Sequence, residues 1–403
     1  MCLLLLCLLP GCLGRLAADD RALQRRRLDS RDAWQTDPPW LPTAVRHPLD
    51  PTRVRTQGRV EWRGPGRPPG SDAASDGVTL TWAGSALVAR FTGPALALDL
   101  QAWGEVHLDI TVDGHASLLS PPDGPHRRYA LSGLREGPHT LVVYKSTEGR
   151  AGHVDLRALY LPPGRLLLPP PPPPARRLEF IGDSMTVGAC VLSDGREIWD
   201  RRDTHCHGFS FAARTARALS AEHRAIAVSG LGVSHSLGPS TAAGIPPRAV
   251  QLYDRLRPDP GSPPDDDPTW QPDAVIVLLG HNDVLYAGRT RTPFAPRFAD
   301  DYVDLVRALR RRYPRSLIVC TTGGMYQSRA LALRQAWADA LKRLQATDPR
   351  IVSHRFSAWS FLHPRAHTQA RLADELTRLL AAQLGWTLTP ADVAPPGATS
   401  DDQ

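Results

Sequence analysis

The sequence predicts an all-β sandwich domain followed by an α/β domain built on a parallel sheet. The chain has 403 residues, more than the roughly 250–300 at which single hydrophobic cores stop growing. Upstream, apolar residues recur at every second position, which is typical of half-buried strands. Downstream, continuous apolar runs alternate with helical segments, as in parallel sheets covered on both faces. An unbroken proline run, 169–174, separates the two patterns.

Composition narrows the class of protein. Charged residues make up 22% and hydrophobic residues 42% of the chain, which argues against wholesale disorder. The net charge is +7, but arginines are scattered among acids and form no basic stripe with aromatic residues. We therefore expect no nucleic-acid partner. The apolar run Leu3–Leu13 is too short to span a bilayer, so no integral membrane segment is expected.

The N-terminus has the features of an export signal over residues 1–18. The apolar run Leu3–Leu13 is followed by small residues and then by charged ones, although no Lys or Arg precedes it. Leu9-Pro10-Gly11-Cys12 also resembles a bacterial lipobox, in which Cys12 would be lipidated. A plain signal peptide and a lipid anchor both remain open. Either one predicts a secreted or otherwise extracytoplasmic protein.

Three cysteines lie beyond this segment: Cys190, Cys206 and Cys320. Their odd number leaves at least one thiol without an intramolecular partner. Cys190 and Cys206 flank one loop, and whether they pair in an oxidising compartment is open. The stretch His205-Cys206-His207 suggests metal binding, but adjacent residues rarely supply several ligands to one tetrahedral ion. No second cluster is spaced to complete such a site, so we expect no metal.

The first domain is predicted over residues 57–162, after an extended linker of residues 19–56 rich in Pro, Arg and Asp. Its clearest strand covers 106–112, where apolar and polar residues alternate strictly before the turn signal Asp113-Gly114. Further strands are expected at Leu87–Phe91, Leu96–Leu100, Thr140–Tyr144 and Val154–Tyr160. Several short strands without a helical pattern indicate an all-β sandwich.

The second domain is predicted over residues 177–389. Residues 163–176 precede it as a stiff Pro-rich linker, and residues 390–403 follow it as a loose tail. The expected strands are Leu178–Ile181, Ala225–Val228, Ala274–Leu279 and Leu317–Cys320. The expected helices are Phe209–Leu219, Tyr302–Arg312, Leu331–Leu344 and Ala370–Leu384. This alternation predicts a three-layer domain.

Candidate catalytic residues follow the predicted strands in order. Ser184, in Gly182-Asp183-Ser184, stands at the first strand-to-helix turn, where its hydroxyl is exposed and its N–H can stabilise an oxyanion. The Gly-x-Ser-x-Gly elbow is excluded because position 186 is Thr. Gly230 ends the second strand, Asn282 offers a second amide after the third, and His363 precedes the last helix.

These four blocks resemble those of the SGNH (GDSL-type) hydrolases, and the resemblance covers about residues 177–386. It implies that Ser184 is the nucleophile and His363 the general base. It also implies an oxyanion hole made of the Ser184 N–H, the Gly230 N–H and the Asn282 side chain.

Two positions depart from the SGNH pattern. Ser360 stands three residues before His363, where most of the superfamily has an Asp that orients the imidazole. Either Ser360 or a backbone carbonyl holds the ring, or the enzyme is weakened. His281 replaces a small residue before Asn282, and we expect it at the pocket rim as a substrate contact. Asp183 and Asp283 are interpreted as structural, Asp183 because it would fix the loop of Ser184.

The upstream domain resembles the jelly-roll domain of carbohydrate esterase family two. The resemblance rests on Leu87–Gly93, Val112–Gly114, Gly133–Thr140 and Lys145-Ser146-Thr147-Glu148 with Gly152. It implies removal of O-acetyl groups from xylan- or glucomannan-type carbohydrate, with no metal or organic cofactor. It also makes the missing acid less surprising, because members of that family dispense with it.

The expected partner is therefore an acetylated poly- or oligosaccharide, bound by a protein expected to be a monomer. Aromatic and thioether side chains near the site are candidates for sugar contacts, with Tyr286 and Trp359 preferred: Trp199, Tyr286, Met325, Tyr326 and Trp359. Two alternatives stay open. One is another SGNH activity (lipase, thioesterase or peptidoglycan O-acetyl esterase), and the other is a non-catalytic carbohydrate-binding protein.

Overall fold

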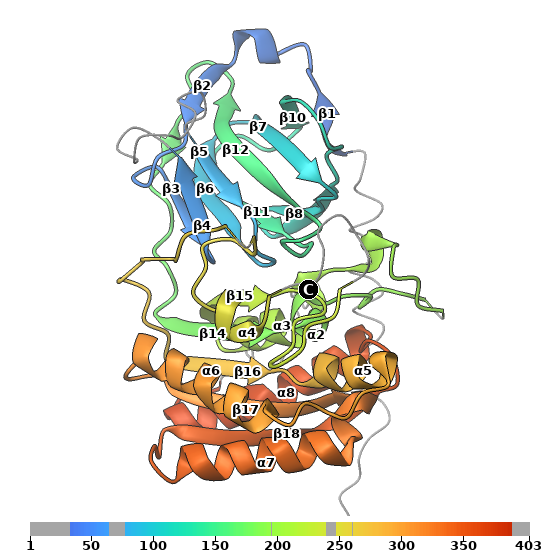
Figure 1. Cartoon of the computed structure of the whole chain (residues 1–403). Coiled ribbons are helices and arrows are strands. Elements are labelled where there is room, and N and C mark those ends of the chain that lie inside the picture. The colour runs from blue at the N-terminus through green and yellow to red at the C-terminus, as the bar shows by residue number, and fades with distance from the viewer. Residues whose placement is uncertain (1–32, 64–76, 195, 239–246, 260, 389–403) are drawn as a thin grey trace, which may run out of the picture.

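The computed structural model describes residues 33–63, 77–194, 196–238, 247–259 and 261–388. The predicted signal peptide, the lipobox at Cys12 and the tail after residue 389 lie outside these residues. A β-sandwich forms one end of the molecule and a helix-covered parallel sheet the other (Figure 1). Among the described residues, no helix has both the length and the apolar character needed to cross a membrane.

The sandwich consists of two antiparallel sheets. The first has seven strands, with β2 attached to β12 beside the order β1-β10-β7-β12-β5-β4. The second has six, with β3 attached to β6 beside the order β13-β6-β11-β8-β9. Their bounds are β1 Gln35–Thr36, β2 Val45–Pro48, β3 Val54–Gln57, β4 Val60–Arg63, β5 Gly77–Leu80, β6 Ala86–Thr92, β7 Ala95–Gly104, β8 Leu108–Val112, β9 His115–Leu119, β10 Arg127–Ser132, β11 Pro138–Lys145, β12 Gly152–Leu161 and β13 Leu167–Leu168.

The predicted strands of the sandwich are present. Alternating side chains from both sheets meet in one apolar core that includes Phe91, Leu98, Ile110 and Leu156. Asp113 and Gly114 have φ angles of 51° and 82°. Both are in the left-handed region that a type I′ hairpin turn requires, as Asp-Gly predicts.

The predicted extended linker of residues 19–56 is wrong for its second half. β1 pairs with β10, β2 with β12 and β3 with β6, so this segment is part of the sandwich. These strands have only two to four residues each. Segments this short show no detectable period, and they become strands only because a sheet edge is available to pair with.

The second domain is built on a five-stranded parallel sheet of order β15-β14-β16-β17-β18. Its elements are β14 Arg176–Gly182, α2 Ser184–Val187, α3 Phe211–Ala218, β15 Ala221–Ala227, α4 Ala249–Leu252, β16 Ala274–Leu278, α5 His281–Thr290, α6 Phe298–Arg312, β17 Leu317–Met325, α7 Leu331–Gln345, β18 Ile351–Ser360 and α8 Ala366–Leu384. Short 3-10 turns lie at Leu41–Thr43, Arg202–Thr204, His207–Phe209 and Tyr326–Arg329.

Both faces of the parallel sheet are covered. α4, α6 and α7 pack on the face that carries Ile181, Val275 and Val277, and α3 and α8 on the face that carries Phe180 and Ile276. β16 is buried along its whole length, which explains its continuous apolar sequence. The chain enters the parallel sheet at β14, continues to β15 on one side of it and then crosses to β16 on the other side. The reversal beside β14 is where such sheets bind ligands, at the carboxyl ends of the strands.

Among the elements that were not predicted from the sequence, two lie at the candidate site: β18 and α5. β18 is one of the two edge strands of the parallel sheet, and exposed polar residues interrupt its buried ones, so no apolar run marks it. α5 starts at His281 directly after Gly280 and has little apolar surface, with only His281, Asn282 and Asp283 buried. Both elements carry or precede candidate site residues, which explains their polar sequences.

The two domains share a buried interface beside β15, the strand nearest the sandwich (Figure 1). Trp82 belongs to the core of the second domain and donates its indole N–H to the carbonyl of Leu256 at 2.7 Å. Arg59 is 1% exposed and forms ion pairs with Glu179 at 3.5 Å and Asp265 at 2.9 Å. These buried contacts tie the sandwich to the α/β domain.

All three cysteines of the described residues are buried free thiols. Cys190 Sγ lies 3.4 Å from His205 Nε2, whereas Cys206 Sγ lies 3.3 Å from Asp109 of the sandwich. Cys190 and Cys206 therefore do not form the disulfide that the sequence left open, and their sulfurs face different partners.

Candidate active site

The four candidate residues meet at the carboxyl edge of the parallel sheet. Ser184 begins α2 after β14, Gly230 follows β15, Asn282 lies in the first turn of α5 after β16, and His363 follows β18. Because all five strands are parallel, these segments emerge at the same edge. Residues far apart in the sequence thus form one site.

Ser184 and His363 are hydrogen-bonded to each other, with 2.8 Å between the serine Oγ and the histidine Nε2. On the other side of the ring, His363 Nδ1 lies 2.7 Å from Glu197 Oε1. A carboxylate only accepts hydrogen bonds, so Nδ1 carries the proton and Nε2 accepts the Ser184 hydroxyl hydrogen. This tautomer is the one that a general base for serine needs.

Glu197 is held as an ionised carboxylate. Its Oε2 accepts from the His363 backbone N–H at 3.1 Å and from Arg365 Nη1 at 3.3 Å. Burial by itself raises the pKa of Glu197, but the hydrogen bonds and charge of His363 and the charge of Arg365 outweigh it, so the pKa is lowered. The group is therefore charged at neutral pH and stabilises the imidazolium that forms during a reaction.

The sequence did not identify Glu197. It lies in the polar loop between α2 and α3, thirteen residues after Ser184, and no motif marks it. The position expected to hold the acceptor does not orient the imidazole: Ser360 is half-exposed and its hydroxyl donates to the carbonyl of Leu362. The acceptor comes instead from a different loop, so spacing relative to the histidine gave no signal.

The turn that carries Ser184 depends on small residues and on Asp183. A Cβ on Gly182 would lie 2.0 Å from Thr186 Oγ1, so no larger residue fits before the helix. Asp183 Oδ1 accepts from the Met185 N–H at 3.0 Å and caps the helix. Through these contacts Asp183 holds the turn that carries Ser184.

Gly230 is confined to glycine by the fold of its own loop. Its φ is +84°, and an added Cβ would lie 1.4 Å from the carbonyl oxygen of Leu237. Leu237 also donates its N–H to the Gly230 carbonyl at 2.7 Å. This closed loop presents the backbone of Gly230 at the carboxyl edge, as expected for an oxyanion-hole residue.

Asn282 differs from its expected role. Its amide nitrogen donates to Asp183 Oδ2 at 3.2 Å and to the Leu231 carbonyl at 3.0 Å. Both amide hydrogens thus have acceptors within the protein, and the side chain ties the Ser184 turn to the Gly230 loop. An oxyanion could receive a hydrogen bond from this amide only by sharing one of them.

The sequence predicted His281 at the pocket rim, but the structure places it in the interior. Its side chain is 2% exposed, with Nδ1 at 3.3 Å from Asp183 Oδ2 and Nε2 at 2.9 Å from the Gly323 carbonyl. Burial alone lowers the pKa of His281, but hydrogen bonding to Asp183 and the charge of that carboxylate raise it overall. A buried ring between two acceptors supports the active-site turn and is not placed to contact substrate.

Asp283 is structural, as predicted. Its carboxylate accepts from the backbone N–H groups of Val233, Ser234 and His235 at 2.8–2.9 Å. This fixes the segment that follows Gly230. Next on α5, Tyr286 stacks on His235 with ring centroids 4.4 Å apart, so one of its faces is already covered.

Three exposed aromatic side chains gather on the segments that follow β17 and precede His363. Trp359 is 38%, Tyr326 50% and Phe361 67% exposed, and their ring centroids lie 5.1–6.3 Å apart. We call Tyr326, Trp359 and Phe361 the aromatic patch. Phe361 was missed by the sequence analysis. Of the other candidates, Met325 is buried and the Trp199 ring lies 5.4 Å from that of His363.

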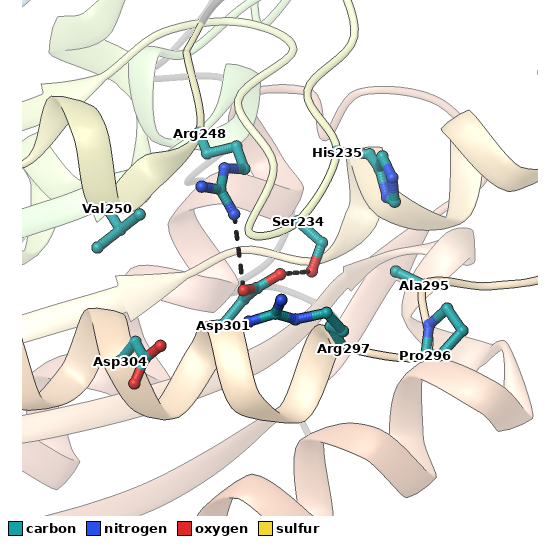
Figure 2. A pocket seen from close by; sticks show the side chains of 9 residues that line it. All are labelled: Ser234, His235, Arg248, Val250, Ala295, Pro296, Arg297, Asp301 and Asp304. Atoms are coloured by element: carbon teal, nitrogen blue, oxygen red, sulfur yellow. Dashed lines mark hydrogen bonds and ion pairs between the residues drawn. The ribbon is translucent and has the colours of Figure 1, made fainter.

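Two further features of the structure contain side chains that could bind a ligand. Cys190, Glu197 and His363 offer ligand atoms within 4.8 Å of one another, but Glu197 and His363 already bind each other. A cavity of about 430 Å³ lies between the segment after Gly230 and α6. In Figure 2 the Asp301 carboxylate lies between Ser234 and Arg248, to which it is bound at 2.6 and 3.6 Å. Ser184, Glu197 and His363 do not line this cavity.

Comparisons with known proteins agree with this architecture. The family "Carbohydrate esterase 2 N-terminal" matches residues 66–171, and the "GDSL-like Lipase/Acylhydrolase family" matches residues 180–376. Cellulase/esterase CelE of Acetivibrio thermocellus is 28% identical over 328 residues, which are 77% of this chain and 38% of that protein. An acetylxylan esterase / glucomannan deacetylase of Cellvibrio japonicus is 26% identical over 280 residues, covering 67% of this chain and 73% of that protein.

The fold of both domains is shared with a solved structure. A family two carbohydrate esterase from Clostridium thermocellum, in complex with cellohexaose, superposes with a TM-score of 0.72 at 26% identity. The match covers 83% of this chain and 100% of that one. The chain thus joins a carbohydrate esterase 2 N-terminal sandwich to a GDSL-type hydrolase domain, which is the two-domain architecture of that family two carbohydrate esterase.

Proposed function

We propose that this protein is a serine esterase that removes O-acetyl groups from carbohydrate. The observation that carries the proposal is the hydrogen-bonded chain Ser184–His363–Glu197 at the carboxyl edge of the sheet. Two contacts of 2.8 and 2.7 Å link the three side chains in the order that a nucleophile, a base and an orienting acid require. The match to the GDSL-like Lipase/Acylhydrolase family supports the class of reaction, and the names of the relatives support the substrate.

The proposed reaction has two stages. His363 Nε2 takes the Ser184 proton as the oxygen attacks the acetyl carbonyl, and Glu197 stabilises the resulting imidazolium. As the bond between the acetyl carbon and the sugar oxygen breaks, the imidazolium protonates that oxygen, which leaves as a sugar hydroxyl while the acetyl group stays on Ser184. Water, activated by His363 in the same way, attacks this ester and releases acetate. No step needs a metal or an organic cofactor.

The oxyanion of the tetrahedral intermediates is proposed to be held by the Ser184 and Gly230 backbone N–H groups. The start of α2 favours negative charge near the Ser184 N–H. Asn282 contributes mainly by holding the two donor-bearing segments at a fixed separation, with its amide as a shared third donor. Such fixed donors cost no reorganisation when charge develops, which makes them effective.

The aromatic patch supports a carbohydrate substrate. Trp359 and Phe361 precede His363 by four and two residues, so a chain bound across them would pass close to the catalytic base. Flat apolar faces that are solvent-exposed and contiguous mark a binding surface in a soluble protein. A sugar ring has a matching apolar face, and the aromatic rings lose little side-chain entropy on binding.

The test is acetate release by wild type and Ser184→Ala from an activated acetyl ester and from acetylated xylan and glucomannan. We expect release from all three by wild type and a loss of roughly 10³-fold or more in the variant. Activity confined to the activated ester would contradict the carbohydrate substrate. Release by Ser184→Ala equal to that by wild type would contradict the serine mechanism.

A further inference from the structure

The segment Lys145-Ser146-Thr147-Glu148, which starts at the last residue of β11 and leads toward β12, is unusually buried for a connection. These four residues are 0–5% exposed, although connecting segments normally lie at the surface. They are buried because they reach into the α/β domain. The Ser146 carbonyl accepts from the His207 N–H at 2.9 Å across the domain boundary.

Glu148 binds the backbone next to the proposed oxyanion hole. Its Oε2 accepts from the Ser229 N–H at 2.6 Å, and Ser229 directly precedes Gly230. A buried carboxylate makes a stronger hydrogen bond to a backbone N–H than a neutral acceptor does. Glu148 therefore fixes one side of Ser229, and the Leu237–Gly230 bond fixes the other side of Gly230.

The loop that presents Glu148 is itself rigid. Lys145 Nζ donates to the carbonyls of Thr147 at 2.7 Å and Glu148 at 3.1 Å. The Lys145 backbone accepts a hydrogen bond from the Gly84 N–H and donates one to the Ser85 carbonyl, at 2.9 Å each. The carboxylate is thus held by a closed set of contacts inside the sandwich, and it has little freedom to leave Ser229.

Glu148 also contacts the opposite side of the site. Its Oε1 lies 3.5 Å from Arg202 Nη1. The Arg202 guanidinium lies 4.9 Å from the centroid of the Trp199 ring, which lies 5.4 Å from that of His363. One carboxylate of the sandwich thus touches both the Gly230 side and the loop that carries Glu197.

We propose that Glu148 is a positioning residue for catalysis, through which the sandwich domain aims the Gly230 N–H of the neighbouring domain. The inference rests on the proposed esterase function. It assigns to the sandwich a part in the chemical step, besides any part in binding. A displacement of about 1 Å in a reacting geometry can cost about 10²-fold in rate, so the expected loss in Glu148→Ala is about 10- to 100-fold in kcat.

The experiment compares Glu148→Ala and Glu148→Gln with wild type, on an activated acetyl ester too small to reach the aromatic patch. We expect the kcat of Glu148→Ala to fall with KM changed less than threefold. We expect Glu148→Gln to recover most of the loss, because an amide oxygen also accepts from the Ser229 N–H. The melting temperature of each variant is measured beside its kinetics.

Glu61→Ala is the matched control. Glu61 is 4% exposed on β4 and pairs with Arg257 across the same domain boundary, away from Ser229. It should lower the melting temperature while kcat stays within twofold of wild type. An equal kcat loss in Glu61→Ala, or a wild-type kcat in Glu148→Ala, would overturn the inference. If Glu148→Ala does not fold, folded Glu148→Gln provides the test, and the inference predicts that this variant retains part of the wild-type kcat. A kcat of Glu148→Gln below one hundredth of the wild-type value would overturn the inference. Inactive wild type would instead count against the proposed function.

Discussion

The two sides of Ser184 are built in different ways. On the base side, one ionised carboxylate, Glu197, holds His363 through a single loop of the α/β domain. On the proposed oxyanion side, the proposed donors are backbone N–H groups whose segments are kept in place by many contacts, including those of Asn282 and the sandwich residue Glu148. A side that depends on one group should fail when that group is lost, and a side supported by several should weaken in smaller steps.

Glu197→Gln should have the largest effect after loss of the nucleophile. Glu197 Oε1 accepts from His363 Nδ1 and Oε2 accepts from the His363 N–H and Arg365. A glutamine amide has only one oxygen. If that oxygen accepts from His363 Nδ1, the NH₂ group faces the donors His363 N–H and Arg365; if the amide is flipped, the NH₂ group faces His363 Nδ1. The second orientation puts the proton on Nε2, where it blocks removal of the Ser184 proton. We expect kcat on an activated acetyl ester to fall by roughly 10³–10⁴ with KM little changed.

Ser360 supplies the control for Glu197. Ser360→Asp in the wild type should leave kcat within about threefold, because His363 Nδ1 is already occupied. A Glu197→Gln variant that keeps a tenth or more of wild-type kcat would show that Glu197 is dispensable. The base side would then resemble the arrangement expected from the sequence, with the imidazole held by another acceptor.

Asn282→Ala tests the other side and should be milder. It removes one shared donor and the link between Asp183 Oδ2 and the Leu231 carbonyl. Loss of one oxyanion donor costs about 10²–10³ in kcat, and we expect the lower end of that range because the backbone donors remain. Steady-state kinetics on the same ester measure this loss of kcat. Asn282→Asp is not a suitable control, because it would place a second carboxylate against Asp183. A loss larger than that in Glu197→Gln would reverse the order of the two sides.

The sequence predicted the catalytic residues that follow strand ends. It did not predict residues whose role depends on contacts with distant parts of the chain. Ser184, Gly230 and His363 lie where strand, turn and motif indicated. Glu197 could not be predicted, because a histidine can receive its acceptor from any loop that folds over it. The β1–β3 segments were missed for a similar reason, since two- to four-residue strands exist only through pairing. Asn282 was placed correctly, but only coordinates reveal the acceptors that its amide already has.

The sandwich has a further contact with the nucleophile side, and it should affect stability with little effect on rate. His207 Nδ1 lies 2.9 Å from the Thr186 carbonyl, so it carries a proton. His207 Nε2 therefore accepts from His223 Nε2 at 3.1 Å, and His223 Nδ1 faces Gln57 Nε2 of the sandwich at 3.5 Å. A further proton on either ring would set two donors against each other.

Burial lowers the pKa of His223 to about 3, and burial with the neighbouring His223 lowers the pKa of His207 well below its usual value. The unfolded rings have a pKa of about 6.5, so between pH 6.5 and 3 the unfolded state binds more protons. Stability is then fully present above about pH 6.5 and falls as pH drops, by up to about 1.4 kcal/mol per pH unit for each ring.

His223→Gln should make this decline shallower while kcat at pH 7.5 stays within about threefold, because a glutamine amide still donates to His207 but does not titrate. Free energies of unfolding from urea titrations at pH 8, 6 and 5 measure the slope. An unchanged slope in His223→Gln would mean that the interface accommodates a charged ring. The domain boundary would then be looser at acid pH than its buried contacts indicate, and the oxyanion side, which depends on that boundary, should lose activity over the same pH range.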